Sequence, residues 1–255
     1  MPPRLCYPRP VMASPRLTPE EIAGLDRRFR DAPPEELLRW ALSTWGRGIA
    51  LAWSGAEDVA ILEMMHRIDP AAARVFTLDT GRLNPETYDL IDRVRGKYGI
   101  DVEVVFPEAR AVETMVRSKG VNLFYHSLEN RQECCRIRKV EPLKRVLGTL
   151  EGWITGVRRA QSVTRTDLGK IEFDAAHGGI VKLNPLADWS TAQVFDYLKA
   201  HDVPKNLLHD QGYPSIGCAP CTRAVKPGED ERSGRWWWEN PDSKECGLHS
   251  RKRQA

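Results

Sequence analysis

The pattern of apolar and polar positions predicts a chain in which helices and strands alternate. Apolar residues recur at the spacing of one helix face between residues 19 and 45, so we expect helices there. The run GIALAW (48–53) reads as a buried strand and leads into a helical pattern that begins near Val59. A second strand and helix follow over residues 73–99, with Gly99 at the expected helix end.

The later part of the chain predicts two more strands and a hairpin. Residues 101–107 alternate like a third strand, and residues 152–159 begin a fourth. Residues 170–186 read as a β-hairpin that turns at residues 177–179, and a last helix opens at the candidate cap Ser190. Strands that alternate with helices form parallel sheets, so we predict an α/β domain with a mainly parallel twisted sheet flanked by helices. Its ligands are expected beyond the carboxyl ends of the strands.

We expect one structural domain and two irregular ends. Residues 1–18 are Pro-rich and are expected to be a disordered arm, residues 19–235 form the predicted domain, and residues 236–255 form an irregular, mobile C-terminal segment. The chain has no apolar run that could cross a bilayer, and its start lacks the apolar core of a signal peptide. We therefore expect a cytoplasmic protein without a membrane partner.

The charge of the chain favours small anionic ligands. With 38 Lys and Arg against 35 Asp and Glu, the 255 residues carry a formal net charge of +3. This excess is too small and too evenly spread for a nucleic-acid-binding protein, which usually has a dense basic face.

Two loops at strand ends are candidates for binding a nucleotide. Ser54 and Gly55 lie between a strand and a helix, where backbone N–H groups can face an anion at the positive end of the helix dipole. An ordinary strand-to-helix turn is the alternative for this loop. Asp79 and Thr80 end the neighbouring strand, where they can contact a sugar or a phosphate. Two adjacent loops of this kind favour a nucleotide site.

Arginines follow the fourth predicted strand. Arg158, Arg159 and Arg165 come shortly after Gly156. Guanidinium groups donate paired hydrogen bonds to tetrahedral oxyanions. A solvated surface is the usual setting of an Arg pair, but the preceding strand and Gly156 favour an anion clamp here.

Four of the six cysteines occur as two close pairs. Cys134 is adjacent to Cys135, and Cys218 and Cys221 have the spacing Cys-x-x-Cys. In a reducing compartment such thiols are typical of metal ligands or catalytic groups. A four-iron cluster suits adjacent thiolates better than zinc does, because neighbouring side chains diverge from a single tetrahedral centre. A zinc site and unliganded structural cysteines are the alternatives.

The remaining two cysteines differ in their surroundings. Cys6 lies in the N-terminal arm and is interpreted as an incidental thiol. Cys246 lies among polar residues near the C-terminus, where a free thiol is either unused or a nucleophile. A nucleophilic thiol needs cationic neighbours to become a thiolate at neutral pH. The candidates are Arg232, Arg235, His249 and Arg251.

Six segments in this order resemble the assimilatory adenylyl-sulfate reductases of bacteria. The segments are WSGAEDV, LDTGRLNPETY, CCRIRKVEPL, TGVRRAQS, GCAPCTR and ECGLH. The resemblance covers roughly residues 45–250, and the cysteine pairs with the terminal ECGLH are its most specific part. It implies an adenine-nucleotide α-hydrolase-like fold. It also implies reduction of adenosine 5'-phosphosulfate (APS) to sulfite and AMP in sulfate assimilation, with reduced thioredoxin or glutaredoxin as donor.

The same resemblance implies roles for individual residues. Cys246 is expected to take up the SO₃ group as a cysteine S-sulfonate, on a segment that closes over the substrate. We expect a homo-oligomer, one [4Fe–4S] cluster, and neither a flavin nor a nicotinamide. The implied cluster ligands are Cys134, Cys135, Cys218 and Cys221, the implied catalytic residues are Cys246, Lys139, Arg232 and Arg235, and the implied substrate-binding residues are Ser54, Gly55, Asp58, Asp79, Thr80, Arg158 and Arg159.

Three other functions are weighed against this one. Reduction of 3'-phospho-APS, alone or together with APS, is the nearest, although reductases that act on 3'-phospho-APS commonly lack the cluster cysteines. An iron–sulfur tRNA-thiolating ATP pyrophosphatase is expected to keep an SGGxDS loop, whereas Ala56 and Val59 replace two of its residues here. A zinc-stabilised binding module leaves Cys246 and the nucleotide loops without a use.

Overall fold

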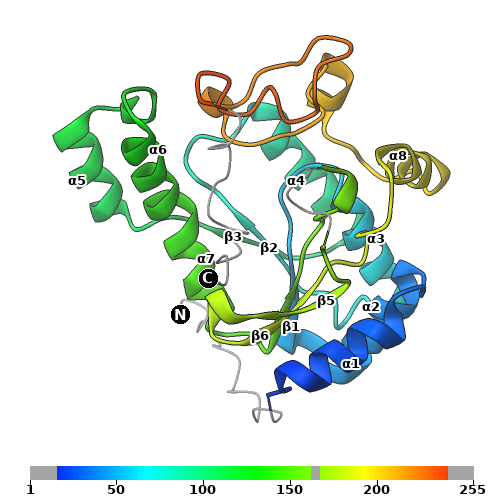
Figure 1. Ribbon diagram of the computed structural model, residues 1–255. Helices are drawn as coiled ribbons and strands as arrows, with labels where there is room; N and C mark the ends of the chain where they lie inside the picture. Colours follow the sequence, from blue (N-terminus) through cyan, green and yellow to red (C-terminus); the bar gives the residue numbers. More distant parts are fainter. Residues whose placement is uncertain (1–15, 162–166, 241–255) are drawn as a thin grey trace, which may run out of the picture.

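A six-stranded sheet forms the centre of the molecule, with the strands in the order β3-β2-β1-β4-β6-β5 (Figure 1). The computed structural model describes residues 16–161 and 167–240. Neighbouring strands are parallel except β5 and β6, which form the antiparallel hairpin predicted from the sequence. The strands are β1 Ile49–Ala52, β2 Val75–Leu78, β3 Val102–Val105, β4 Gly152–Ile154, β5 Ile171–Asp174 and β6 Ile180–Leu183.

The helices begin and end largely where local sequence signals place them. Thr18 caps α1 in a capping box with Glu21, and Ser190 caps α8 in the same way. Gly99 ends α4 in the left-handed conformation, with φ 64°. The α-helices are α1 Pro19–Phe29, α2 Pro34–Trp45, α3 Val59–Ile68, α4 Pro85–Tyr98, α5 Ala109–Lys119, α6 Leu128–Cys135, α7 Glu141–Leu147 and α8 Thr191–Ala200.

Shorter helical turns connect several of these elements. A π-helix, η3 Arg136–Val140, joins α6 directly to α7. The 3₁₀ turns are η1 Gly46–Gly48, η2 Leu123–Tyr125, η4 Arg159–Gln161, η6 Ala175–His177, η7 Leu207–Gln211 and η8 Ala219–Cys221.

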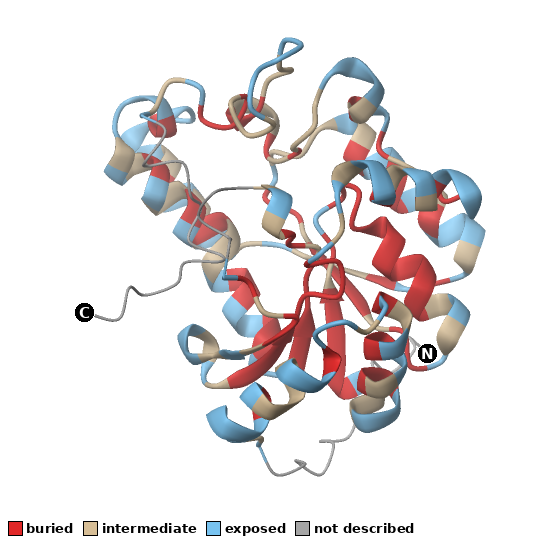
Figure 2. Ribbon diagram, turned by 45° about the vertical axis from the view of Figure 1, so that its right-hand side comes forward, coloured by how far each residue is buried: buried red, intermediate tan, exposed pale blue. Residues whose placement is uncertain are grey.

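The sheet is buried on both faces, because successive residues of a strand point to opposite sides. Ile49 and Leu51 of β1 join the large core cluster that α1, α2, α3, α4 and α8 complete on one face. Ala50, between them, faces a second cluster that includes residues of α7. Figure 2 shows the resulting red band of buried residues through the sheet. The predicted α/β architecture is therefore confirmed.

The apolar pattern did not predict α5 and α6. Figure 1 shows these helices projecting from the sheet, together with the turn between them. Their faces are largely polar, since Met115 alone is buried in α5 and only Arg131 and Cys135 are buried in α6. Helix α6 lacks an amphipathic pattern, whereas α5 has a narrow apolar stripe, missed in the sequence, of Ala111, Val112, Met115 and Val116.

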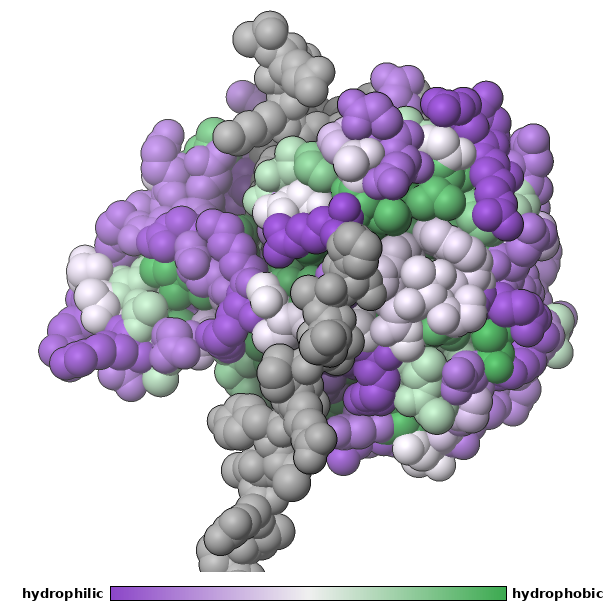
Figure 3. Space-filling model, turned by 90° about the horizontal axis from the view of Figure 1, so that it is seen from below, coloured by the Kyte–Doolittle hydropathy of each residue, from purple (hydrophilic) through white to green (hydrophobic). Residues whose placement is uncertain are grey.

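The surface of the domain is mixed in character. Hydrophilic side chains cover most of the face seen from below in Figure 3. Among the described residues, no helix combines the length and the apolar character needed to span a bilayer.

Candidate active site

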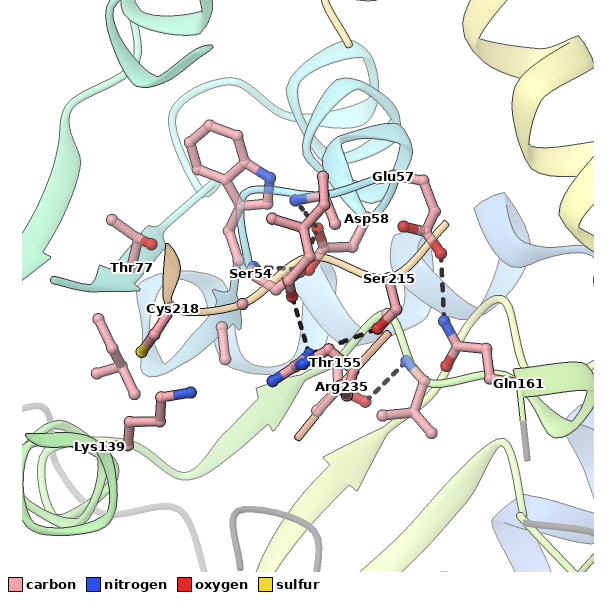
Figure 4. A pocket seen from close by; sticks show the side chains of 18 of the residues that line it. Ser54, Glu57, Asp58, Thr77, Lys139, Thr155, Gln161, Ser215, Cys218 and Arg235 are labelled. Carbon is pink, nitrogen blue, oxygen red and sulfur yellow. Dashed lines mark hydrogen bonds between the residues drawn. The ribbon is translucent and has the colours of Figure 1, made fainter. Parts of the chain in front are cut away.

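A cleft with a volume of about 210 Å³ lies beyond the carboxyl ends of β1, β2 and β4 (Figure 4). Its position agrees with the expectation for a parallel sheet. One wall is apolar and comes from sheet residues such as Phe76 and Trp153. Its polar and charged lining residues include Ser54, Glu57, Asp58, Thr77, Thr80, Lys139, Thr155, Gln161, Ser215, Cys218, Glu231, Arg232 and Arg235.

The loop after β1 is held closed by the Asp58 carboxylate. Asp58 accepts hydrogen bonds from the backbone N–H of Ser54 (2.7 Å), the Ser54 hydroxyl (2.9 Å) and the N–H of Ala56 (3.2 Å). Gly55 has φ +78°, and a Cβ there would lie 2.6 Å from Cγ2 of Thr87. Position 55 therefore requires glycine. Ser54 and Asp58 line the cleft, whereas Gly55 shapes the loop behind them.

Burial has a large effect on Asp58. It raises the pKa of the carboxyl from 3.8 to about 7; the Ser54 N–H acts in the opposite direction and the charge of Glu57 adds to the rise. Gly156, after β4, packs directly on this side chain. A Cβ at position 156 would lie 2.3 Å from Cβ of Asp58. The strand-end glycine and the Asp58 loop therefore fit together only because residue 156 has no side chain.

The loop after β2 contributes Thr80 and Leu83 to the cleft. Asp79 does not line it; its Oδ1 accepts hydrogen bonds from the N–H of Gly81 (2.7 Å) and the Tyr88 hydroxyl (2.9 Å). Thr80 does line the cleft, and its Oγ1 lies 3.3 Å from Sγ of Cys218. Asp79 thus supports the loop that presents Thr80.

The predicted cationic residues fall into two groups. Arg158 is buried and pairs with Glu57 at 2.7 Å, and Arg159 pairs with Asp188; neither lines the cleft. Arg232 and Arg235, by contrast, line it. Arg235 donates to the Ile216 carbonyl at 3.1 Å.

Lys139 completes the cationic side of the cleft. It follows the cysteine pair by one helical turn and lines both the cleft and a smaller second cavity. Figure 4 shows its ammonium group extending into the cleft near Cys218. Lys139, Arg232 and Arg235 are therefore the predicted cations that the structure brings to the cleft.

The second cavity contains the two cysteine pairs. Cys134, Cys135, Cys218 and Cys221 all line it, and three of the four are buried. Burial and then Cys218 raise the pKa of Cys221 to about 12. Burial acts in the same direction on Cys218, but Lys139, the Thr80 hydroxyl and Arg235 together lower its pKa. The chain thus brings four thiols together beside several cations.

This donor set fits a metal cluster better than a single ion. Among residues 16–161 and 167–240, no group of three or more Cys, His, Asp or Glu is arranged to hold one metal ion. The four thiols nevertheless surround one cavity. Four thiolates around four iron atoms form a wider cage than four around one zinc, and a cluster so bound carries negative charge that nearby cations offset.

Two residues next to the thiols had no assigned site role in the sequence. Arg131 is fully buried on α6, and its guanidinium lies 4.7 Å from the ring centre of Trp236. The position of Arg131 contained a usable signal, because residues three and four apart share a helix face and Cys134 and Cys135 follow at those spacings. Trp236 lines both cavities.

Glu57 and Gln161 were also missed. They lie in the cleft wall, where the Gln161 amide donates to Glu57 at 3.2 Å (Figure 4). Both lie inside segments that carry the family resemblance, Glu57 in WSGAEDV and Gln161 in TGVRRAQS, so membership of those segments was the signal that could have found them. Several residues named from the sequence lie outside the described residues; these are Cys6, Arg165, Cys246, His249 and Arg251.

Comparison with known proteins identifies the family. Residues 48–224 match the phosphoadenosine phosphosulfate reductase domain. The chain belongs to the phosphoadenosine phosphosulfate reductase family. This family domain contains both nucleotide loops, Lys139 and all four cysteines of the second cavity.

Two named reductases show how close the relationship is. 5'-Adenylylsulfate reductase 3 of Arabidopsis thaliana is 50% identical over 238 residues, which cover 90% of this chain and 51% of that protein. The chain thus spans about half the length of that relative. Adenosine 5'-phosphosulfate reductase of Burkholderia cepacia is 59% identical over 175 residues, covering 69% of this chain and 70% of that one.

A solved structure of the same family has the same fold. Phosphoadenylyl-sulfate reductase from Candida auris, in a phosphate complex, superposes with a TM-score of 0.71 at 29% identity. The superposition covers 84% of this chain and 100% of that one. This similarity agrees with the adenine-nucleotide α-hydrolase-like fold that the six sequence segments implied.

Proposed function

We propose that the protein reduces APS to sulfite and AMP, with Cys246 as the nucleophile. The observation that carries this proposal is the position of Lys139, Arg232 and Arg235 in a cleft at the strand ends, beside a cavity lined by four thiols. Relatives at 50% and 59% identity are named as reductases of this sulfonucleotide. Sulfate assimilation is the process that consumes such a product.

The reaction proceeds in three steps in which atoms and electrons balance. The Cys246 thiolate attacks the sulfur of APS; an S–S bond forms, the S–O bond breaks, and AMP leaves with the bonding electron pair. A donor thiolate then attacks Sγ of Cys246, and sulfite leaves with the electrons of the S–S bond. The second donor thiol resolves the mixed disulfide. Sulfur gains two electrons, the donor dithiol becomes a disulfide, and Cys246 is regenerated.

The cationic side chains have a clear task in the first step. Negative charge accumulates on the bridging oxygen as AMP leaves, and fixed positive charges stabilise that transition state. A pair of unit charges 4 Å apart is worth about 4 kcal/mol near a protein surface, before desolvation. Lys139, Arg232 and Arg235 supply that charge, and the apolar side of the cleft, where Leu78 and Leu83 are partly exposed, offers a surface for the adenine ring.

We further propose that Cys134, Cys135, Cys218 and Cys221 hold one [4Fe–4S] cluster. When bound, the cluster supplies a fixed negative centre behind Lys139, without a flavin or a nicotinamide. Reduced thioredoxin or glutaredoxin is the proposed donor, because the S-sulfonate must be cleaved by a dithiol. Such donors and free thiols belong to a reducing compartment, and we propose the cytoplasm. Whether the enzyme is a homo-oligomer stays a prediction.

The decisive experiment uses the anaerobically purified full chain. Sulfite release from APS and from 3'-phospho-APS, with thioredoxin as donor, is expected to be much faster for APS. Cys246→Ser is expected to keep its iron and its AMP affinity while losing turnover entirely. Trapping with labelled APS and mass spectrometry should place SO₃ on Cys246; label on another residue would contradict the mechanism.

Iron analysis tests the cluster separately. About four irons per chain are expected, and Cys218→Ser should lose most of them. A colourless protein with one zinc would contradict the cluster while leaving the fold assignment intact.

A further inference from the structure

A buried ion pair joins the thiol cavity to the start of the C-terminal segment. The Arg131 guanidinium donates from Nε to Oε1 of Glu239 at 2.9 Å and from Nη2 to Oε2 at 2.8 Å. The side chains of Arg131 and Glu239 are only 1% and 8% exposed. Such a bidentate fork fixes direction as well as distance. The sequence predicted a mobile segment from residue 236 onward. The described part of that segment, residues 236–240, is instead anchored by this pair.

Trp236 links this pair to both cavities. Its backbone N–H donates to the Cys221 carbonyl at 3.1 Å. Its ring centre lies 4.7 Å from the guanidinium carbons of both Arg131 and Arg235. Its φ of +43° is unusual for a bulky residue and must be held by its surroundings. The Glu239 N–H donates to the Trp236 carbonyl at 2.8 Å and closes the turn.

We propose that Arg131 and Glu239 are positioning residues that set where, and in which direction, the chain leaves the thiol cavity toward Cys246. The inference rests on the proposed function, because it needs Cys246 as the nucleophile. Cys246 is seven positions after Glu239 along the chain. A fully extended chain of that length reaches at most about 24 Å.

The size of the rate loss shows whether the pair limits only the length of the free chain or also fixes its direction. If Glu239 is released, the next described attachment is Trp238, whose ring lies 4.5 Å from that of Tyr125, and the free span lengthens from seven positions to eight. Loop entropy alone then lowers the local concentration of the thiol only about 1.2-fold. A loss of tenfold or more therefore requires that the pair also orient the segment.

The charge of the pair also relates it to the thiols. The Arg131 guanidinium donates to the Glu239 carboxylate and also interacts with the Cys135 side chain. Loss of Glu239 leaves that charge buried with one fewer partner, which is costly in a protein interior.

The test measures single-turnover S-sulfonation of Cys246 in the full, iron-loaded chain. Glu239→Gln is expected to slow S-sulfonation at least tenfold, while AMP affinity and iron content change less than twofold. Glu239→Asp keeps the charge on a shorter side chain. Its S-sulfonation rate is expected to lie between those of Glu239→Gln and the unsubstituted protein. The matched control is Glu103→Gln, because Glu103 also accepts two hydrogen bonds from one guanidinium. Arg74 donates them at 2.6 and 3.1 Å, and the pair does not line the cleft. This control is expected to react at the unsubstituted rate.

Each other outcome overturns the inference. An S-sulfonation rate for Glu239→Gln within twofold of the unsubstituted protein means that the pair does not position the segment. A parallel loss of AMP affinity, iron and rate means that the pair is only structural. Failure of the proposed function is distinguishable, because Cys246→Ser would then keep turnover whatever Glu239→Gln does.

Discussion

The Thr80 hydroxyl lies 3.3 Å from Sγ of Cys218. Thr80 belongs to the loop after β2, whereas Cys218 is 138 residues further along the chain. This contact joins the wall of the nucleotide cleft to the thiol cavity. A substitution in the cleft wall at Thr80 is therefore expected to affect the thiol cavity.

Thr80→Val is expected to weaken iron retention. The substitution keeps the shape of the side chain but removes a hydrogen bond to Cys218, which is worth about 1 kcal/mol net, or about fivefold in an equilibrium. Iron release to a chelator should become about fivefold faster. Thr77→Val is the matched control, because Thr77 also lines the cleft on the β2 side. Equal release rates for the two variants would contradict the proposed link.

Gly156→Ala is expected to damage the nucleotide loop. The added Cβ meets Cβ of Asp58 at 2.3 Å, so the loop that presents Ser54 must move. AMP affinity should fall at least tenfold, with a loss of about 1–3 kcal/mol in the free energy of unfolding. Calorimetric titration and urea denaturation measure both quantities.

Gly96→Ala provides the control for that substitution. Gly96 lies inside α4, and a Cβ there meets nothing within 4 Å. Its free energy of unfolding should rise by about 0.5–1 kcal/mol, because alanine favours the helix. If both glycines tolerate alanine equally, close packing on Asp58 is not important.

The raised pKa of Asp58 predicts a pH-dependent stability. Because the pKa is about 7 in the folded protein against 3.8 in the unfolded chain, the folded state holds this proton more tightly. The Asp58 contribution to the free energy of unfolding therefore falls as pH rises from about 4 to about 7, by on the order of 4 kcal/mol. Asp58→Asn lacks this titration. Subtracting its urea-denaturation curve from that of the unsubstituted protein should reveal the slope, and parallel pH profiles would disprove it.

Arg232 and Arg159 should differ in their effect on catalysis. Arg232 lines the cleft, whereas Arg159 pairs with Asp188 and donates to the Leu168 carbonyl at 2.8 Å. We expect Arg232→Ala to lower kcat/KM for APS at least tenfold and Arg159→Ala to lower it less than threefold. Steady-state sulfite assays measure both. A larger loss of kcat/KM for Arg159→Ala than for Arg232→Ala would support the anion clamp after β4 that the sequence predicted.

Periodicity was sufficient to predict the layers of this fold. The apolar runs at β1 and β2 are completely or nearly completely buried, and the cap signals at Ser190 and Gly99 lie at real helix ends. Local physics decides such features, so one sequence contains them. Helix α5 was missed although Ala111, Val112, Met115 and Val116 form a narrow apolar stripe along it.

The site was only partly predictable, because several of its relations depend on distant contacts. Cysteine spacing indicated a shared thiol site, since few other arrangements use such pairs in a reducing compartment. Nothing local indicates that Arg158 turns toward Glu57, 101 residues away, rather than toward the cleft. The pairing of Arg131 with Glu239 across 108 residues is equally invisible before the chain folds.

The π-helical turn at Arg136–Val140 sets the angular phase between two halves of one long helical segment. Before it, Cys134 and Cys135 face the thiol cavity; after it, Leu143 and Val146 pack under the sheet. A π turn accommodates one residue more than a regular α-helical turn. Deleting a single residue there would rotate one half against the other by about 100°. Chain length in this short stretch is therefore under tighter constraint than the chemical identity of its exposed side chains.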